Sequence, residues 1–344
     1  MQTISLLMFN RNENEGIIRN IRLLKDAVDE IVIIDSSDPE KYKELKNSFK
    51  LFNNINIKLF RVLPLGHVEP LFHYGINKTS SEYVLRLDAD EEPSKKLVKR
   101  IKERKLLYDV YDIPVEDKKK LIGYKLMVLF SKKSVKEISG IIHSGIKFKE
   151  KPKNFPKDEF IINHEKPTRD RITKNYVEIE SYERPMEVYL NYLKKKDKWF
   201  IGNLLSFIYN LPKPVNIYLT AVGISYARTI FDIIQHNDRP FNDIFYTICY
   251  IVKNPISQIN YSIHTMKFFS NLPKEEQKLR IKIAKEIQEY GGVIKYLGLD
   301  RDYIVENLTR TFKWDMSGTE AFRKLLLYRH FHKKPAYRFP YYIR

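Results

Sequence analysis

The fold is decided by residues 82–94, which read EYVLRLDADEEPS. An apolar run of strand length, Glu82–Leu87, leads directly into Asp88, Ala89 and Asp90. A buried strand that ends in this way places two carboxylates at the carboxyl edge of a sheet, where open α/β folds bind their ligands. The stretch therefore predicts an α/β fold with an acidic site at one edge of its sheet.

The residues before this stretch alternate between strand and helix patterns. Compact apolar runs predict strands, and apolar residues at three- and four-residue spacing predict helices. The expected strands are Thr3–Phe9, Glu30–Ile34, Asn56–Val62 and Glu82–Leu87, and the expected helices are Asn14–Val28, Glu40–Leu51 and the region near Val68–Lys78. This series is typical of a Rossmann-like, mostly parallel central sheet flanked by helices.

The pattern changes after the first four strands. Short strands are expected at Val110–Val115, Tyr124–Phe130, Ile138–Ile142 and Phe160–Asn163. From about Pro167 the chain reads as helical almost to its end, with helices that include Gln258–Phe269, Lys274–Tyr290 and Thr319–Tyr328. We therefore expect an α/β domain over residues 1–170, a helical region over 171–330 and a basic, aromatic tail over 331–344.

Composition excludes several classes of protein. The chain has 344 residues, and its single cysteine, Cys249, excludes an intrachain disulfide framework and a cysteine-based zinc site. The N-terminal apolar stretch Ile4–Phe9 is too short for a signal peptide, and no window approaches the ~20 apolar residues of a membrane span. We expect a cytoplasmic protein that does not span a membrane, although it can be peripheral on one.

The net charge points to anionic partners. The 61 Lys and Arg residues exceed the 43 Asp and Glu residues, which gives a formal charge of +18. Such an excess favours nucleotides, nucleic acid or an anionic membrane surface, without choosing among them. The alternative is that most of these charges form an ordinary lysine-rich surface.

The acidic stretch has the composition of a metal site. Asp88 and Asp90 can share a divalent cation, and Glu92 lies on the same side of an extended segment. Carboxylate oxygens are hard ligands, which favour Mg²⁺ or Mn²⁺. The alternative is a helix N-terminus, because Ser94 is a good N-cap for the helix that follows. Capping accounts for Ser94 but leaves the acids directly after an apolar strand without an explanation.

Two further strand ends carry polar residues. Asn12 and Glu13 lie at the first turn between a strand and a helix, where backbone amides can hold a nucleotide. Asp35 ends the second strand, where nucleotide-binding α/β folds often place an acid on the ribose or base. Turns are rich in Asn and Asp for conformational reasons alone, so each signal is weak without the others.

The segments TISLLMFNRNENEGIIRNIRLLKDAVDEIVIIDSSDPE, residues 3–40, and HYGINKTSSEYVLRLDADEEPS, residues 73–94, resemble the family-2 glycosyltransferases of the GT-A fold. The most similar variants are of the lipopolysaccharide-core type, which carry DADE. The resemblance is specific over residues 3–95 and weaker over 96–175. It implies a nucleotide-sugar donor, a Mn²⁺ or Mg²⁺ ion on the donor's diphosphate, and inversion at the anomeric carbon.

The same resemblance implies roles for individual residues. Donor-binding residues would be Asn12, Glu13, Asp35, Asp88, Ala89 and Asp90, and metal ligands would be Asp88, Asp90, Glu92, His143 and His164. Relatives carry His-Glu about 50 residues after the acidic pair, whereas this chain has His143 followed by Ser144. The catalytic base is therefore left open among Glu165, Asp158 and Glu159. His143 and His164 are alternatively ordinary structural histidines near strand ends.

The C-terminal half interleaves aromatic and basic residues, for example Tyr182, Tyr189 and Trp199 with Lys194–Lys196. Helices of this kind can lie at a lipid interface, which would suit a lipid-linked acceptor. The alternative is a helical subdomain whose apolar stripes pack on each other.

The sequence predicts a metal-dependent inverting glycosyltransferase that acts on a glycan or lipid-linked acceptor. A nucleotidyl transferase with the same carboxylates, a basic nucleic-acid-binding protein and a catalytically degenerate scaffold are the alternatives. Steep salt-dependent binding to DNA or RNA would favour the nucleic-acid-binding protein. Loss of Mn²⁺-dependent donor hydrolysis would favour the degenerate scaffold. The donor sugar, the nucleotide base, the acceptor and the oligomeric state are not encoded in these motifs.

Overall fold

The computed structural model describes residues 2–52, 54–62, 68, 71–117, 120–138, 146–163, 182, 222, 263–265, 267–291, 293–298 and 318–335. The chain divides into two compact units. One unit comprises Met1–Arg169 together with Gly292–Arg344, and the other comprises Asp170–Gly291.

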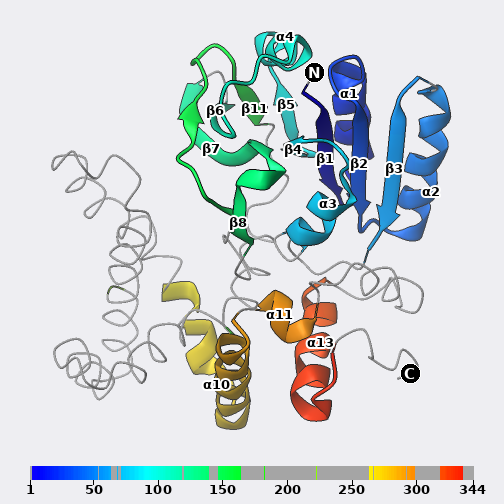
Figure 1. Ribbon diagram of the computed structural model, residues 1–344. Coiled ribbons are helices and arrows are strands. Elements are labelled where there is room, and N and C mark those ends of the chain that lie inside the picture. Colours follow the sequence, from blue (N-terminus) through cyan, green and yellow to red (C-terminus); the bar gives the residue numbers. More distant parts are fainter. Residues whose placement is uncertain are drawn as a thin grey trace, which may run out of the picture. The chain divides into compact units, whose positions relative to one another are not determined.

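A mixed sheet of nine strands forms the centre of the first unit in the part of the chain that is described. Its order is β3-β2-β1-β4-β7-β6-β11-β5, and β10 pairs with β6 (Figure 1). The strands are β1 (Ile4–Asn10), β2 (Glu30–Asp35), β3 (Asn56–Arg61), β4 (Tyr83–Asp88), β5 (Glu91–Pro93), β6 (Val110–Asp117), β7 (Lys120–Ser131), β10 (Lys153–Asn154) and β11 (Ile161–Asn163). A second sheet pairs β8 (Val135–Ile138) with β9 (Ile146–Phe148).

Strands β1 to β4 are parallel to one another, as the alternating pattern predicts. Antiparallel pairs join β4 to β7, β7 to β6, and β11 to β5. The α-helices among the described residues of this unit are α1 (Asn14–Leu24), α2 (Pro39–Ser48), α3 (Phe72–Lys78), α4 (Lys95–Glu103), α11 (Val293–Leu297) and α13 (Gly318–His332). The predicted Rossmann-like α/β architecture, a largely parallel central sheet flanked by helices, is confirmed. The residues described beyond position 263 are mainly helical, in α10 (Lys274–Glu289), α11 and α13.

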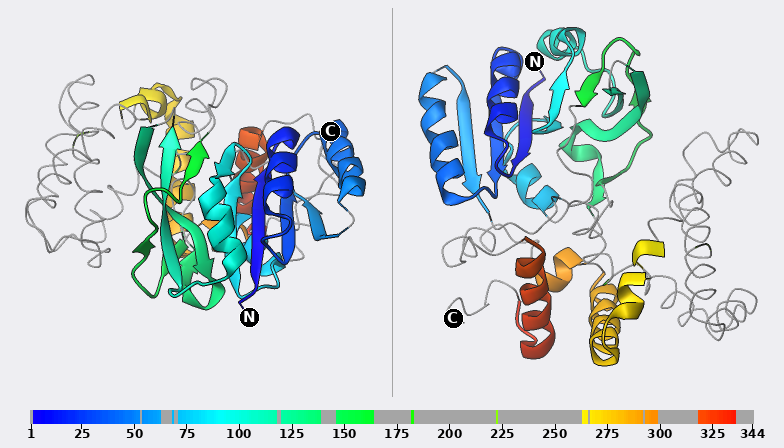
Figure 2. Two further views of the ribbon diagram at one scale, coloured as in Figure 1. Left: turned by 90° about the horizontal axis from the view of Figure 1, so that it is seen from above. Right: turned by 180° about the vertical axis from the view of Figure 1, so that it is seen from behind.

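The pleat of β1 divides its apolar side chains between two layers. Leu6 and Met8 belong to the buried core that includes residues of α1, α2 and α4. Leu7 and Phe9 point to the opposite face, where α3 packs so closely that a Cβ on Gly75 would lie 3.0 Å from Leu7 Cδ1. The helices therefore cover both faces of the sheet, and both faces of β1 are apolar for this reason (Figure 2).

The observed elements differ from the predicted ones at their ends. Helix α3 is short and begins at Phe72, and β7 extends from Lys120 to Ser131. Strand β5 was not predicted, because three residues directly after an acidic turn show no alternation of their own. It is defined by pairing with β11, in which Glu91 lies opposite Asn163.

A buried ion pair joins three strands at the amino edge of the sheet. Glu30 on β2 is 2% exposed, and its carboxylate accepts hydrogen bonds from Ser5 Oγ on β1 at 2.5 Å and from Lys58 Nζ on β3 at 2.6 Å. The backbone N–H of Ser80 also donates to it. Burial acts to raise the pKa of Glu30, but the hydrogen bonds from Lys58, Ser5 and Ser80 outweigh it and lower that pKa to about 2.

This pair makes stability depend on pH. Because the pKa of Glu30 is lowered in the folded protein, Glu30 contributes fully to the free energy of unfolding above the ordinary carboxyl pKa. This contribution is lost as the pH falls from about 5 towards 2. Glu30→Gln is expected to lower the free energy of unfolding at pH 7 by about 2 kcal/mol. The variant should also lose less stability than the wild type between pH 7 and pH 3.5. Urea unfolding at pH 7 and pH 3.5 measures both effects. The control is Glu44→Gln, which removes an exposed acid paired with Lys41. An equal loss of stability between pH 7 and pH 3.5 in the wild type and both variants would contradict the expectation.

The second unit is described mainly through α10 (Lys274–Glu289). Arg280 on this helix is buried, and its guanidinium lies 4.3 Å from the Tyr182 ring centroid and 5.5 Å from that of Phe268. Its Nε also pairs with Glu276 at 2.9 Å. Tyr182 was one of the aromatic residues considered for a lipid interface, and at this position packing inside the unit is what is observed.

The other aromatic residues of residues 176–209 lie outside the described part. No helix within the described part combines the length and the apolar character that a membrane crossing requires.

Candidate functional site

Three polar residues end neighbouring strands at the carboxyl edge of the sheet. Asn10 ends β1, Asp35 ends β2 and Asp88 ends β4. In the register of these strands Asn10 lies opposite Asp35, and Phe9 lies opposite Asp88. The structure therefore brings the predicted residues Asp35 and Asp88 to one edge, on either side of β1.

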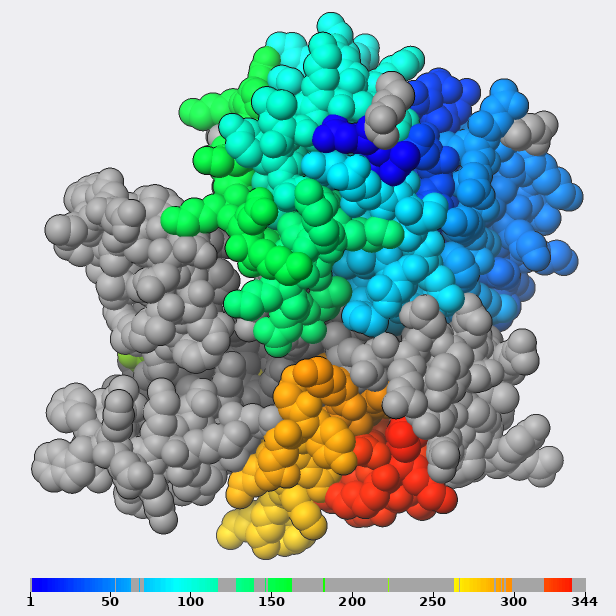
Figure 3. Space-filling view, viewed as in Figure 1, coloured from blue at the N-terminus to red at the C-terminus, as the bar shows by residue number. Residues whose placement is uncertain are grey.

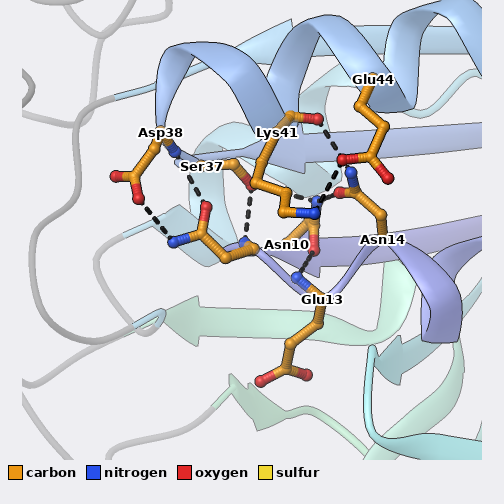
Figure 4. Close-up of polar contacts among 8 residues, drawn as sticks. Asn10, Glu13, Asn14, Ser37, Asp38, Lys41 and Glu44 are labelled. Carbon is orange, nitrogen blue, oxygen red and sulfur yellow. Dashed lines mark hydrogen bonds and ion pairs between the residues drawn. The ribbon is translucent and has the colours of Figure 1, made fainter.

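Asn10 is the centre of a buried polar network (Figure 4). Its Nδ2 group donates to Asp35 Oδ2 at 2.6 Å, to Asn14 Oδ1 at 3.1 Å and to Ser37 Oγ at 3.2 Å. Its Oδ1 accepts from the backbone N–H of Glu13 at 3.1 Å. Asn10 and Ser37 were not singled out from the sequence, although a polar residue ending an apolar strand was the available signal.

Asp35 ends β2 as predicted, and its carboxylate is enclosed by hydrogen-bond donors. Its side chain is fully buried, and its carboxylate accepts hydrogen bonds from Asn10, from the Ser37 backbone N–H at 3.0 Å and from Ser37 Oγ at 3.0 Å. Burial raises the pKa of Asp35, although these hydrogen bonds act in the opposite direction. Asp35, predicted to contact the base or ribose, therefore links the ends of β1 and β2 through Asn10 and Ser37.

Asn12 joins the same two loops at the surface. Its backbone N–H donates to Ser37 Oγ at 2.8 Å, and its side chain exchanges two hydrogen bonds with Asp38, at 2.9 Å and 3.0 Å. Its φ of 63° lies in the left-handed region, which Asn tolerates better than most residues. Glu13, by contrast, turns its carboxylate away from this network in Figure 4.

The Asn12 contacts predict an order of stabilities. Asn12→Ala loses the side-chain hydrogen bonds and must hold a β-carbon at positive φ, so we expect a loss of about 2 kcal/mol. Asn12→Gly loses the same hydrogen bonds without the conformational cost, and we expect a loss of about 1 kcal/mol. Urea unfolding compares the two variants. A glycine variant that is no more stable than the alanine variant would show that the positive φ is not maintained.

The turn Asp88-Ala89-Asp90 is anchored from several sides. The Asp88 backbone N–H donates to Glu91 Oε2 at 2.8 Å, and Glu91 is 4% exposed. Arg19 Nη2 on α1 donates to Ala89 O at 3.3 Å, and Asn20 Nδ2 donates to Glu91 O at 2.8 Å. Glu91 was not among the predicted residues. The sequence feature that could have indicated it is the spacing of three residues between Asp88 and Glu91. At this spacing a Glu side chain can reach back to accept a hydrogen bond from a backbone N–H.

Gly16 allows α1 to lie directly against this turn. A Cβ built on Gly16 would be 1.9 Å from Ala89 O and 2.9 Å from Ala89 C. Both atoms belong to the backbone, so neither can rotate away. The acidic turn therefore takes its position from the first helix as well as from its own strand.

The predicted metal ligands separate into three groups. Asp88 and Asp90 share the anchored turn, and two hard carboxylates on one turn suit a hard divalent cation. Glu92, the predicted third ligand, has its carboxylate 3.1 Å from Arg19 Nε on α1. His143 and His164 lie outside the described residues, as does Glu165. Within the described residues, no cluster of three or more His, Cys, Asp or Glu could hold a metal ion.

Two predicted base candidates are held by cations of α4. Asp158 pairs with Lys96 at 2.6 Å, and this hydrogen bond lowers the pKa of Asp158. Glu159 accepts three hydrogen bonds from Arg100, the shortest at 2.8 Å. Ser94 caps α4 as predicted, and its Oγ also accepts from the Phe160 backbone N–H. In Figure 3 the chain just before β11, coloured green, adjoins helix α4. Both acids therefore fasten the chain before β11 to α4.

One family model matches the part of the chain that holds these residues. The model of glycosyl transferase family 2 matches residues 5–175, a range that contains the polar network and the acidic turn. This chain carries a family 2 glycosyltransferase domain. The protein is accordingly a glycosyltransferase, and the residues at the carboxyl edge lie within its family 2 domain.

Solved structures show a distant likeness to this glycosyltransferase. The structure of S. aureus TarS 1–349 is 10% identical, with 84% of this chain and 92% of that chain covered and a TM-score of 0.35. Its complex with UDP-GlcNAc is 12% identical over the same shares, with a TM-score of 0.37. Its complex with UDP is 13% identical, over 95% of this chain and 91% of that chain, with a TM-score of 0.33. No curated protein sequence matches significantly.

Proposed function

We propose that this family 2 glycosyltransferase is a metal-dependent, inverting enzyme that moves a sugar from a nucleotide-sugar donor to a glycan or lipid-linked acceptor. The observation that supports this most is the anchored Asp88–Asp90 turn beside the polar network of Asn10. Both lie at the carboxyl edge of a parallel sheet, where such folds bind ligands. The DADE motif makes the lipopolysaccharide-core type our proposed subgroup.

The proposed donor site uses the two surface loops and the acidic turn. Asn12, Glu13, Asp88, Ala89 and Asp90 are its proposed contacts, because they follow the ends of β1 and β4. Asp35 supports this site through Asn10 and Ser37 rather than by contact. The loops are held together before any donor binds, so little ordering would be required on binding.

Asp88 and Asp90 are the proposed residues for Mn²⁺ or Mg²⁺, and the histidines at 143 and 164 remain proposed ligands from the resemblance alone. Such an ion, when bound, neutralises negative charge on the nucleoside diphosphate. The chain itself orients the donor, through a turn whose backbone is fixed by Glu91, Arg19 and Asn20.

In the proposed reaction an acceptor hydroxyl attacks the anomeric carbon, the bond to the nucleoside diphosphate breaks, and a carboxylate takes the hydroxyl proton. Because Asp158 and Glu159 are held by Lys96 and Arg100, Glu165 is the proposed base. The proposed acceptor region is the C-terminal region, residues 171–330, and an anionic membrane surface remains a proposed partner because of the +18 charge.

Glu165→Gln is expected to retain donor binding while sugar transfer falls by about a hundredfold or more, since a general base typically contributes that much. Calorimetry with the donor and a radiolabelled transfer assay separate the two quantities. Asp158→Asn is the comparison, because its carboxylate already pairs with Lys96. Unchanged turnover in the Glu165 variant would exclude this residue as the base.

A thermal-shift screen tests the function as a whole. The wild-type protein is heated with UDP, GDP and their common sugar derivatives, each with and without Mn²⁺. A donor at 100 times its dissociation constant stabilises the folded state by about 2.7 kcal/mol, so at least one compound should raise the Tm when Mn²⁺ is present. No shift with any of these compounds would contradict the proposed function.

A further inference from the structure

A buried arginine lies two residues before the acidic turn. Arg86 on β4 is 4% exposed, in a strand whose neighbouring residues Leu85 and Leu87 belong to the apolar core. Its guanidinium carbon lies 4.9 Å from the centroid of the Phe72 ring on α3. A guanidinium in such a place is costly unless charge and aromatic contacts compensate it.

The alternation of the strand directs Arg86 towards Asp88. Residues i and i+2 share one face of a strand, so both side chains lie on the face covered by α3. Arg86 Nη1 is 3.7 Å from Asp88 Oδ1. The arginine side chain is 5% exposed and the Asp88 side chain is 29% exposed, so a buried cation supports an acid that still reaches the solvent.

The backbone of Asp88 is held separately. Glu91 accepts the hydrogen bond of the Asp88 N–H, whereas Arg86 faces the Asp88 carboxylate. One neighbour therefore fixes the main chain and the other faces the side chain. An apolar residue at position 86 would satisfy the packing of the strand, so the packing alone does not account for an arginine there.

We propose that Arg86 is a positioning residue that orients the Asp88 carboxylate towards the diphosphate-sugar donor. This inference rests on the proposed function, because it assigns a purpose to the orientation of Asp88. Arg86 acts through Asp88 and does not itself touch the donor. Phe72 holds the planar guanidinium in place, so lysine should replace arginine only in part.

The first test needs no ligand. A double-mutant cycle compares the wild type, Arg86→Met, Asp88→Asn and the double variant by their Tm values. Replacing a buried charge by an apolar side chain of similar length is often neutral, so Arg86→Met should keep a cooperative transition within a few degrees of the wild type. Asp88→Asn should lower the Tm by at least 3 °C more in the wild type than in the Arg86→Met background. Equal shifts in both backgrounds would overturn the inference, whatever the protein binds.

The second test measures binding of UDP, and of GDP in parallel, with Mn²⁺. Arg86→Met is expected to weaken nucleotide binding about tenfold, and Arg86→Lys is expected to weaken it less. In the Arg86→Met background, adding Asp88→Asn should weaken binding by less than a further threefold. Arg100→Met, which breaks an ion pair on α4, is the matched control and should bind like the wild type. Additive losses would show that Arg86 acts independently of Asp88. A wild type that binds neither nucleotide would contradict the proposed function and leave the Tm cycle as the deciding measurement.

Discussion

Asp90→Ala is expected to abolish the Mn²⁺-dependent thermal shift with the donor and to reduce sugar transfer by at least a hundredfold. Asp90 belongs to the anchored turn between β4 and β5, where charge on the departing nucleoside diphosphate is proposed to be stabilised. Removal of one preorganised group that stabilises such charge typically costs about 10²–10³ in rate. Thermal shifts and a transfer assay at saturating Mn²⁺ measure the two effects.

The control for this variant is Asp26→Ala. Asp26 is an exposed acid that follows α1 and lies outside the site. The comparison therefore removes one negative charge from each protein, and only the Asp90 variant should lose the shift. Retention of the Mn²⁺-dependent shift by Asp90→Ala would remove this residue from the donor site.

Gly16→Ala is expected to destabilise the protein by about 3 kcal/mol, at the upper end of what overpacking costs, and to weaken donor binding as well. The new Cβ would lie 1.9 Å from Ala89 O, and because that atom belongs to the backbone, either α1 or the acidic turn must move. Movement of the turn displaces Asp88 and Asp90 together. Urea unfolding gives the stability, and calorimetry with UDP or GDP and Mn²⁺ gives the affinity.

A second glycine provides the matched comparison. A Cβ on Gly75 would meet side-chain atoms of Leu7 and Phe9 at 3.0 Å and 3.1 Å, and side chains can adjust where a carbonyl cannot. Gly75→Ala is therefore expected to cost about 1 kcal/mol or less and to leave donor affinity unchanged. If both variants lose equal stability and equal affinity, contact with the turn is not what requires Gly16.

Much of the fold follows from local patterns. The strands expected at Thr3–Phe9, Glu30–Ile34 and Glu82–Leu87 are observed at Ile4–Asn10, Glu30–Asp35 and Tyr83–Asp88, because compact and largely apolar runs suit the centre of a parallel sheet. The edge of the sheet that carries the polar residues was predicted for the same reason, since parallel strands end together. Strand β5 could not be predicted, because its only definition is its pairing with β11.

The site was predicted less completely than the fold. Asp88 and Asp90 were identified from their spacing, whereas Glu91 was overlooked because its carboxylate serves a backbone N–H rather than a ligand. The ion pair of Glu92 with Arg19 could not be predicted, because it depends on the approach of α1 to this segment. The ion pairs of Asp158 with Lys96 and of Glu159 with Arg100 could not be predicted either, because they depend on how α4 packs beside the chain before β11.

The order of apolar and polar residues along this chain was sufficient for the class of fold, the sheet edge and the identity of the acidic turn, because those features depend on periods of two or three to four residues. Contacts between distant segments decided the rest. Asp35 is buried against Asn10 and Ser37, and Arg86 faces Asp88. Helices packed on the two faces of the sheet exclude water from the Asp35 carboxylate, whereas the Asp88 carboxylate stays within reach of solvent.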